Sequence, residues 1–112
     1  TAASMGRETY IFLFFWALRR FVNEEFDLKR LSSEFGSEGE RLAKRMQEIN
    51  PISLKEILQE VRGMGNLKIY ACTAAVKIME LEESLVKSKV DDILGLPALL
   101  EIADGAETQL FI

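Results

Sequence analysis

Residues 9–15, with the sequence TYIFLFF, form a continuous apolar segment that limits the choice of fold more than any other part of the sequence. The segment is rich in aromatic residues and has no polar face, which is typical of a strand covered on both sides within a parallel sheet. Residues 16–22 then return to helical spacing. A strand that runs directly into a helix is the first half of a βαβ unit.

The same alternation continues along the rest of the chain. Ser53 and Glu56 form an S-x-x-E helix-start signal before an amphipathic helix, which Gly63 and Gly65 end. We expect further strands at residues 67–71, 91–94 and 108–112, with helical segments at 74–79, 80–89 and 97–103. This order predicts a single α/β domain over residues 1–112, with a mostly parallel sheet and helices on both of its faces.

Residues 23–39 mix charges, serines and glycines, and we expect them to form a polar, mobile connection. Ser37 and Glu40 could form a capping box at the start of the following helix. Leu42, Met46 and Ile49 share one face of that helix, which ends at Asn50-Pro51.

Composition excludes several classes of function. The 112 residues carry a formal net charge of −4, so we expect no nucleic-acid partner, which would need clustered cations. The longest apolar stretch, residues 10–18, falls well short of the roughly 20 residues that cross a bilayer, so we expect no transmembrane segment. The first residues do not have the pattern of a signal segment, and a single cysteine cannot form an internal disulfide, so we expect a cytoplasmic location.

The chain contains no histidine, and this limits its chemistry further. Zinc sites of the Cys/His type, Ser-His-Asp triads and Cys-His proteases all require a histidine within the chain. We therefore predict no metal site of this type, and any cysteine chemistry must be activated in another way. We also predict no cofactor.

Cys72 is the strongest candidate for chemistry, because it lies where a predicted strand passes into a helix. Ligands of open α/β sheets bind beyond the carboxyl ends of the strands, where helix N-termini present free N–H groups. Thr73 and the N–H groups that follow, including that of Ala74, could support an anionic sulfur. The alternative is that Cys72 is a small apolar core residue, which is common for unpaired cysteines.

Three further residues could form the wall of a pocket near Cys72: Trp16, Gly95 and Leu96. An aromatic residue at the position of Trp16 could equally belong to the core or to a contact between subunits. Asp91 and Asp92 open the predicted strand at residues 91–94, so we expect them at the opposite edge of the sheet and assign them no chemistry.

Three segments of the chain together resemble the DsrE/DsrF-like family of small sulfur-relay proteins: TAASMGRETYIFLFFWALRR, NLKIYACTAAVKIM and VDDILGLPALLEIADGAETQLFI. The resemblance implies a three-layer flavodoxin-like fold with four to five strands and assembly into homo-oligomers. It also implies that Cys72 accepts sulfane sulfur as a persulfide. Members of the family open with a strand that is absent here, so we expect the domain to lack its first strand and residues to precede Thr1 in the full protein.

Three functions remain open at this point. The first is a sulfur-relay protein in which Cys72 exchanges sulfur with donor and acceptor proteins. The second is a non-catalytic oligomeric binding or scaffold protein in which Cys72 is structural. The third, a small-molecule or nucleotide pocket at the strand ends, rests on analogy between folds alone.

Overall fold

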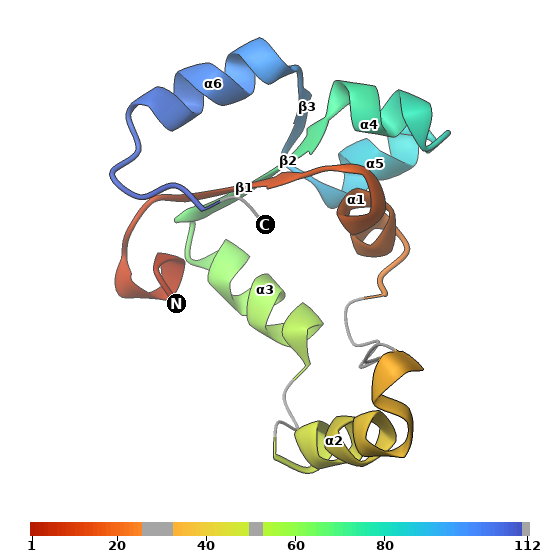
Figure 1. Cartoon of the computed structure of the whole chain (residues 1–112). Helices are drawn as coiled ribbons and strands as arrows, with labels where there is room; N and C mark the ends of the chain where they lie inside the picture. The colour runs from red at the N-terminus through yellow and green to blue at the C-terminus, as the bar shows by residue number, and fades with distance from the viewer. Residues whose placement is uncertain (26–32, 50–52, 111–112) are drawn as a thin grey trace.

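The computed structural model describes residues 1–25, 33–49 and 53–110, and it is a mixed α/β structure built on a parallel sheet (Figure 1). Short 3₁₀ turns lie at Ala3–Met5 and Ser33–Phe35. The strands and helices, in chain order, are β1 (Thr9–Leu13), α1 (Phe15–Val22), α2 (Gly36–Ile49), α3 (Leu54–Gly63), β2 (Leu67–Cys72), α4 (Thr73–Ile78), α5 (Glu83–Lys89), β3 (Asp92–Leu94) and α6 (Leu96–Asp104).

The sheet has the order β1-β2-β3, and both pairings are parallel, as the alternation of strands and helices predicts. Register runs from Thr9 opposite Leu67 to Leu13 opposite Ala71. On the other side of β2, Cys72 lies opposite Leu94. The strand that carries the cysteine is therefore the central one.

The described residues contain three strands, whereas we predicted four to five. The expected closing strand at residues 108–112 is not formed over 108–110, and residues 111–112 lie outside the described part of the chain. A strand needs a neighbour to complete its backbone hydrogen bonds. Here the Gln109 side-chain amide instead donates to the backbone carbonyl of Ala103 at 2.6 Å, which ties the segment to the end of α6.

The core lies on the face of the sheet that α1, α3 and α5 cover. Successive side chains of a strand point to opposite faces, and in β2 it is Leu67, Ile69 and Ala71 that are buried on this side. Leu18 of α1 and Val86 of α5 are fully buried members of the same cluster. These side chains hold the helices to the sheet.

The opposite face is less covered than the sequence of residues 9–15 predicts. Figure 1 shows α6 on this side of the sheet and α3 on the other, so helices do lie on both faces. No residue of β1 is fully buried, because β1 is an edge strand with a partner on one side only. Tyr10 and Phe12 instead form a partly exposed aromatic cluster with Tyr70, with ring centroids 6.2 and 5.3 Å from that of Tyr70. The pKa of Tyr70 is raised, mainly because burial desolvates its hydroxyl group. Electrostatic repulsion from Tyr10, Asp91 and Asp92 raises it further.

Of the two predicted capping boxes, the structure contains the cap at Ser53 but not the one at Ser37. Ser53 is the N-cap of α3, and its side-chain oxygen accepts a hydrogen bond from the backbone N–H of Glu56 at 3.1 Å. Ser37, by contrast, lies inside α2, which already begins at Gly36 behind a 3₁₀ turn, so the predicted box with Glu40 is wrong.

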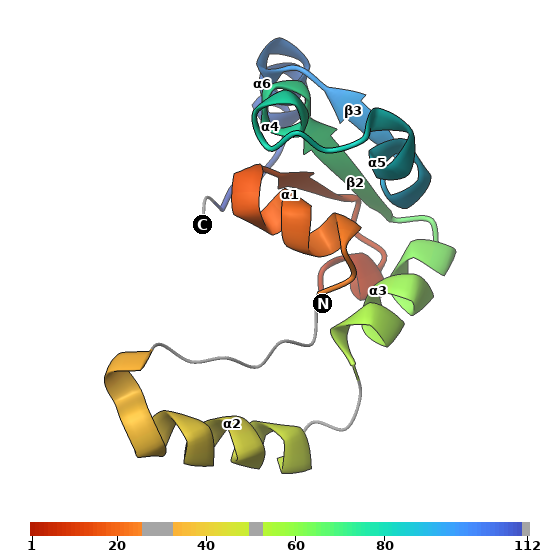
Figure 2. The same ribbon diagram turned by 90° about the vertical axis from the view of Figure 1, so that its right-hand side faces the viewer.

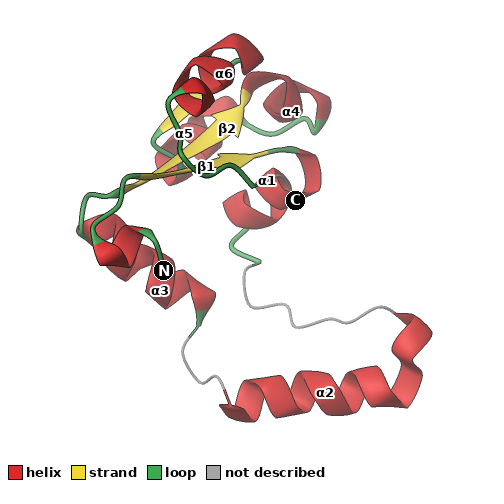
Figure 3. Cartoon of the chain, turned by 60° about the vertical axis from the view of Figure 1, so that its left-hand side comes forward, coloured by secondary structure: helices red, strands yellow, loops and turns green. Residues whose placement is uncertain are grey.

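Helix α2 stands apart from the sheet and the helices that cover it, as Figures 2 and 3 show. Its apolar residues Leu42, Met46 and Ile49 are exposed. The helix is described up to Ile49, and its predicted end at Asn50-Pro51 lies outside the described residues. Part of the predicted polar connection, residues 26–32, lies outside the described residues.

Candidate functional site

The carboxyl ends of all three strands meet at one edge of the sheet. The strands end at Leu13, Cys72 and Leu94, and each passes within two residues into a helix: α1, α4 and α6 respectively. Three helix N-termini, with their free N–H groups, are therefore gathered at this edge. It is the place where open α/β sheets bind their ligands.

Cys72 is the last residue of β2 and the N-cap of α4, with an extended backbone at φ −77° and ψ 126°. This confirms the predicted transition from strand to helix at Cys72. The side chain belongs to the buried core cluster, yet Cys72 keeps an exposed fraction of 9%. Cys72 is thus a buried residue at the carboxyl end of the central strand.

Thr73 and Ala74 are the first two residues of α4. Cys72 takes the capping position, and Thr73 follows it within the helix. The backbone N–H groups of this first turn have no acceptor within the helix. They carry the positive end of the helix dipole and lie next in sequence to the thiol.

The three residues predicted as a pocket wall lie at the same edge. Trp16 is in the first turn of α1, Gly95 is the N-cap of α6, and Leu96 is the first residue of α6. Trp16 is 66% exposed and Leu96 57% exposed, so both present most of their surface to solvent. The guanidinium carbon of Arg19 lies 5.0 Å from the centre of the Trp16 ring, a cation–π contact.

Phe15 is a feature of this edge that the sequence does not reveal. It begins α1 with φ at +43°, a conformation that is rare for a residue with a bulky side chain. Such strain costs on the order of 1–3 kcal/mol and clusters at functional sites. A glycine would have signalled the turn, but the residue here is aromatic.

No three or more Cys, His, Asp or Glu side chains within residues 1–25, 33–49 and 53–110 gather so that they could hold a metal ion. Over the same described residues, no helix has both the length and the apolar character needed to cross a bilayer.

Comparison with known proteins gave no match, either among family models or among curated proteins.

Proposed function

We propose that the chain is a sulfur-relay domain that carries sulfane sulfur as a persulfide on Cys72. The observation that supports this most directly is the position of Cys72 at the carboxyl end of the central parallel strand and at the start of α4. The resemblance of three chain segments to the DsrE/DsrF-like family points to the same residue. The three-layer flavodoxin-like architecture, homo-oligomeric assembly and a cytoplasmic location belong to the same proposal.

The transfer takes two exchange steps. In the first, the Cys72 thiolate attacks the outer sulfur of a donor persulfide, so that a new S–S bond forms on Cys72 while the S–S bond of the donor breaks. The donor leaves as a thiolate and takes up the proton that Cys72 lost. In the second, an acceptor thiolate attacks the outer sulfur and releases Cys72. Sulfane sulfur moves between thiols without net oxidation.

The neighbouring groups have supporting roles in this proposal. The Cys72 side chain accepts no capping hydrogen bond from α4 in this structure. In the proposal, the N–H groups of Thr73 and Ala74 donate to the sulfur once it is anionic, because the first turn of a helix has no internal acceptors for them. Trp16, Gly95 and Leu96 border the approach from the side of α1 and α6. An exposed border of this kind suits a protein donor, which has to come close to the thiol.

Mass spectrometry after incubation with a persulfide or thiosulfate donor tests the proposal. Wild-type protein should gain the mass of one sulfur atom on the peptide that contains Cys72, and dithiothreitol should remove it. Cys72→Ser should gain none. An unmodified wild type, or an adduct that persists in Cys72→Ser, would rule out the relay.

A second function, an oligomeric binding or scaffold protein, is favoured by one specific observation. Cys72 belongs to the buried core cluster with 9% exposure, and a packing residue has the same environment. In that case Cys72→Ala assembles as the wild type does, and the folded wild type takes up no sulfur.

A further inference from the structure

A pocket of about 200 Å³ lies away from Cys72, between the C-terminal end of α1, helix α3 and the C-terminal end of α5. Helix α1 starts at the carboxyl edge of the sheet, so its last residues lie toward the amino ends of the strands. Phe21 and Leu58 provide apolar lining. The charged lining consists of Glu24 and three cations, which are Lys55, Arg62 and Lys89.

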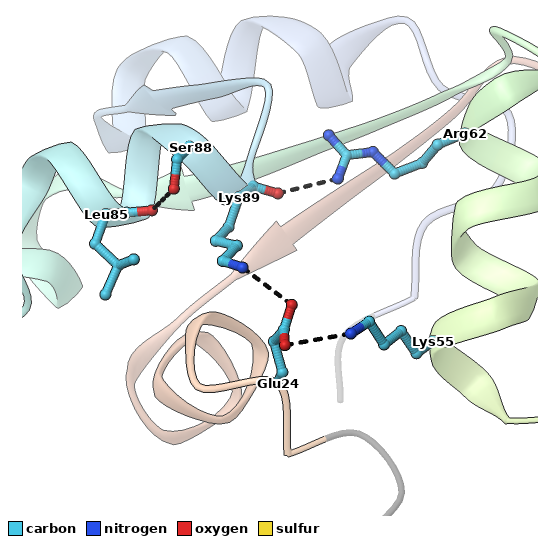
Figure 4. Close-up of polar contacts among 6 residues, drawn as sticks. All are labelled: Glu24, Lys55, Arg62, Leu85, Ser88 and Lys89. Carbon is cyan, nitrogen blue, oxygen red and sulfur yellow. Dashed lines mark hydrogen bonds and ion pairs between the residues drawn. The ribbon is translucent and has the colours of Figure 1, made fainter.

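Glu24 lies between two of these cations, as Figure 4 shows. Its Oε1 lies 3.0 Å from Lys89 Nζ, and its Oε2 lies 3.2 Å from Lys55 Nζ. The hydrogen bonds from Lys89 and then Lys55 hold the pKa of Glu24 below its usual value. One carboxylate of the chain therefore occupies the point where cations from two different helices converge.

Arg62 adds a third positive charge from α3. Its Nη1 donates to the backbone carbonyl of Lys89 at 3.0 Å, and its Nη2 lies 3.4 Å from Asp91 Oδ1 (Figure 4 shows the first of these contacts). Three cations thus face two carboxylates at this site. The local excess of positive charge contrasts with the net charge of −4 of the whole chain.

The backbone at Glu24 is in a conformation that normally favours glycine. Its φ is +58°, its N–H donates to the carbonyl of Phe21 at 3.1 Å, and the N–H of Glu25 donates to the carbonyl of Arg20 at 2.8 Å. This is the Schellman ending of a helix, with Glu24 at the position where glycine is preferred. Glu80 adopts a similar φ of +52° just beyond α4 but is not among the residues that line the pocket, so it provides a matched control.

We propose that this pocket binds a small tetrahedral oxyanion, of the phosphate or sulfate class, and that the Glu24 carboxylate takes the place of that anion in the free protein. Lys55 and Lys89 already hold two carboxylate oxygens, and a tetrahedral anion offers the same type of acceptor together with a further oxygen for Arg62. The volume of about 200 Å³ is below the roughly 300–1,000 Å³ typical of sites for larger ligands, which favours a small anion over a nucleotide.

The test measures binding of inorganic phosphate and of sulfate to the whole chain by NMR titration, without any sulfur donor, so that its outcome is independent of Cys72. Glu24→Gln removes the competing charge and should bind phosphate at least about tenfold more tightly than wild type, which corresponds to about 1.4 kcal/mol. Glu80→Gln makes the same change of charge outside the pocket and should bind as wild type does. A small phosphomonoester in a parallel titration distinguishes an esterified ligand from the free anion.

Two further variants test whether tighter phosphate binding arises at this pocket. Combining Glu24→Gln with Lys55→Gln and Lys89→Gln should abolish the tighter binding. Glu24→Gly, which suits the positive φ, should bind phosphate as tightly as Glu24→Gln does. It replaces Glu24→Gln in the test if that variant does not fold. The proposal is overturned if neither Glu24 variant binds phosphate more tightly than Glu80→Gln, or if the gain survives the loss of both lysines.

Discussion

Leu18→Ala is expected to lower the free energy of unfolding by about 3 kcal/mol, within the range for leucine truncation in a well-packed core. Leu18 has no exposed surface and lies in α1, which packs on α4 and α5. Its removal would leave a cavity next to the buried residues of the sheet. Domains of this size are stable by only about 5–15 kcal/mol, so this one change would remove a large share of the total.

Urea denaturation followed by circular dichroism measures this loss directly. Leu100→Ala is the matched control, because Leu100 lies on α6 and is 58% exposed. The control should change stability by less than about 1 kcal/mol. Equal losses in the two variants would contradict the description of the core on the α1 side of the sheet.

Asp91→Ala is expected to cost about 2 kcal/mol, because it leaves a backbone donor of the central strand without an acceptor. Asp91 Oδ2 accepts a hydrogen bond from the N–H of Ile69 at 2.7 Å. The N–H of Asp91 donates in turn to the carbonyl of Ile69 at 2.8 Å, and Ile69 is almost fully buried. The carboxylate thus extends the bonding between β2 and the start of β3.

Urea denaturation and amide hydrogen exchange together check this role of Asp91. The N–H of Ile69 should lose protection in Asp91→Ala. The neighbouring exposed carboxylate provides the control, and Asp92→Ala should cost less than about 1 kcal/mol. If the exchange of the Ile69 N–H were unchanged in Asp91→Ala, the side-chain bond would have no structural role.

The sequence predicts those parts of the fold that depend on local pattern. The alternation in residues 67–71 and the helical spacing in residues 74–79 locate β2 and α4 to within one residue at each end. The S-x-x-E signal at Ser53 also marks a real helix start. Each of these features depends on interactions between residues a few positions apart.

Features that depend on distant partners could not be predicted in this way. Residues 108–110 have the alternation of a strand, but whether a strand forms depends on a neighbour for its backbone, and here Gln109 bonds to α6 instead. The contacts of Glu24 with Lys55 and Lys89 join positions 31 and 65 residues apart. No local pattern signals such a cluster.

The sequence predicts where the candidate site lies in the fold, but not how deeply its residues are buried. Sequence pattern brings Cys72, Trp16 and Leu96 to one edge of the sheet, because each follows or ends a predicted parallel strand. It cannot give the 9% exposure of Cys72, since this depends on how α1 and α4 pack around the strand end. The strained φ of Phe15 has no sequence signal either.

A sulfur relay requires that a donor reach Cys72 in the folded protein, and the rate at which a small thiol reagent labels Cys72 measures this access. If labelling required global unfolding, a stability of at least about 5 kcal/mol would slow it more than a thousandfold relative to the unfolded chain. Leu18→Ala would then accelerate it by about a hundredfold. We predict labelling within about a hundredfold of the unfolded rate, and the same rate in Leu18→Ala. A labelling rate more than about a thousandfold below that of the unfolded chain, and faster in Leu18→Ala, would show that donors cannot reach Cys72 in the folded protein.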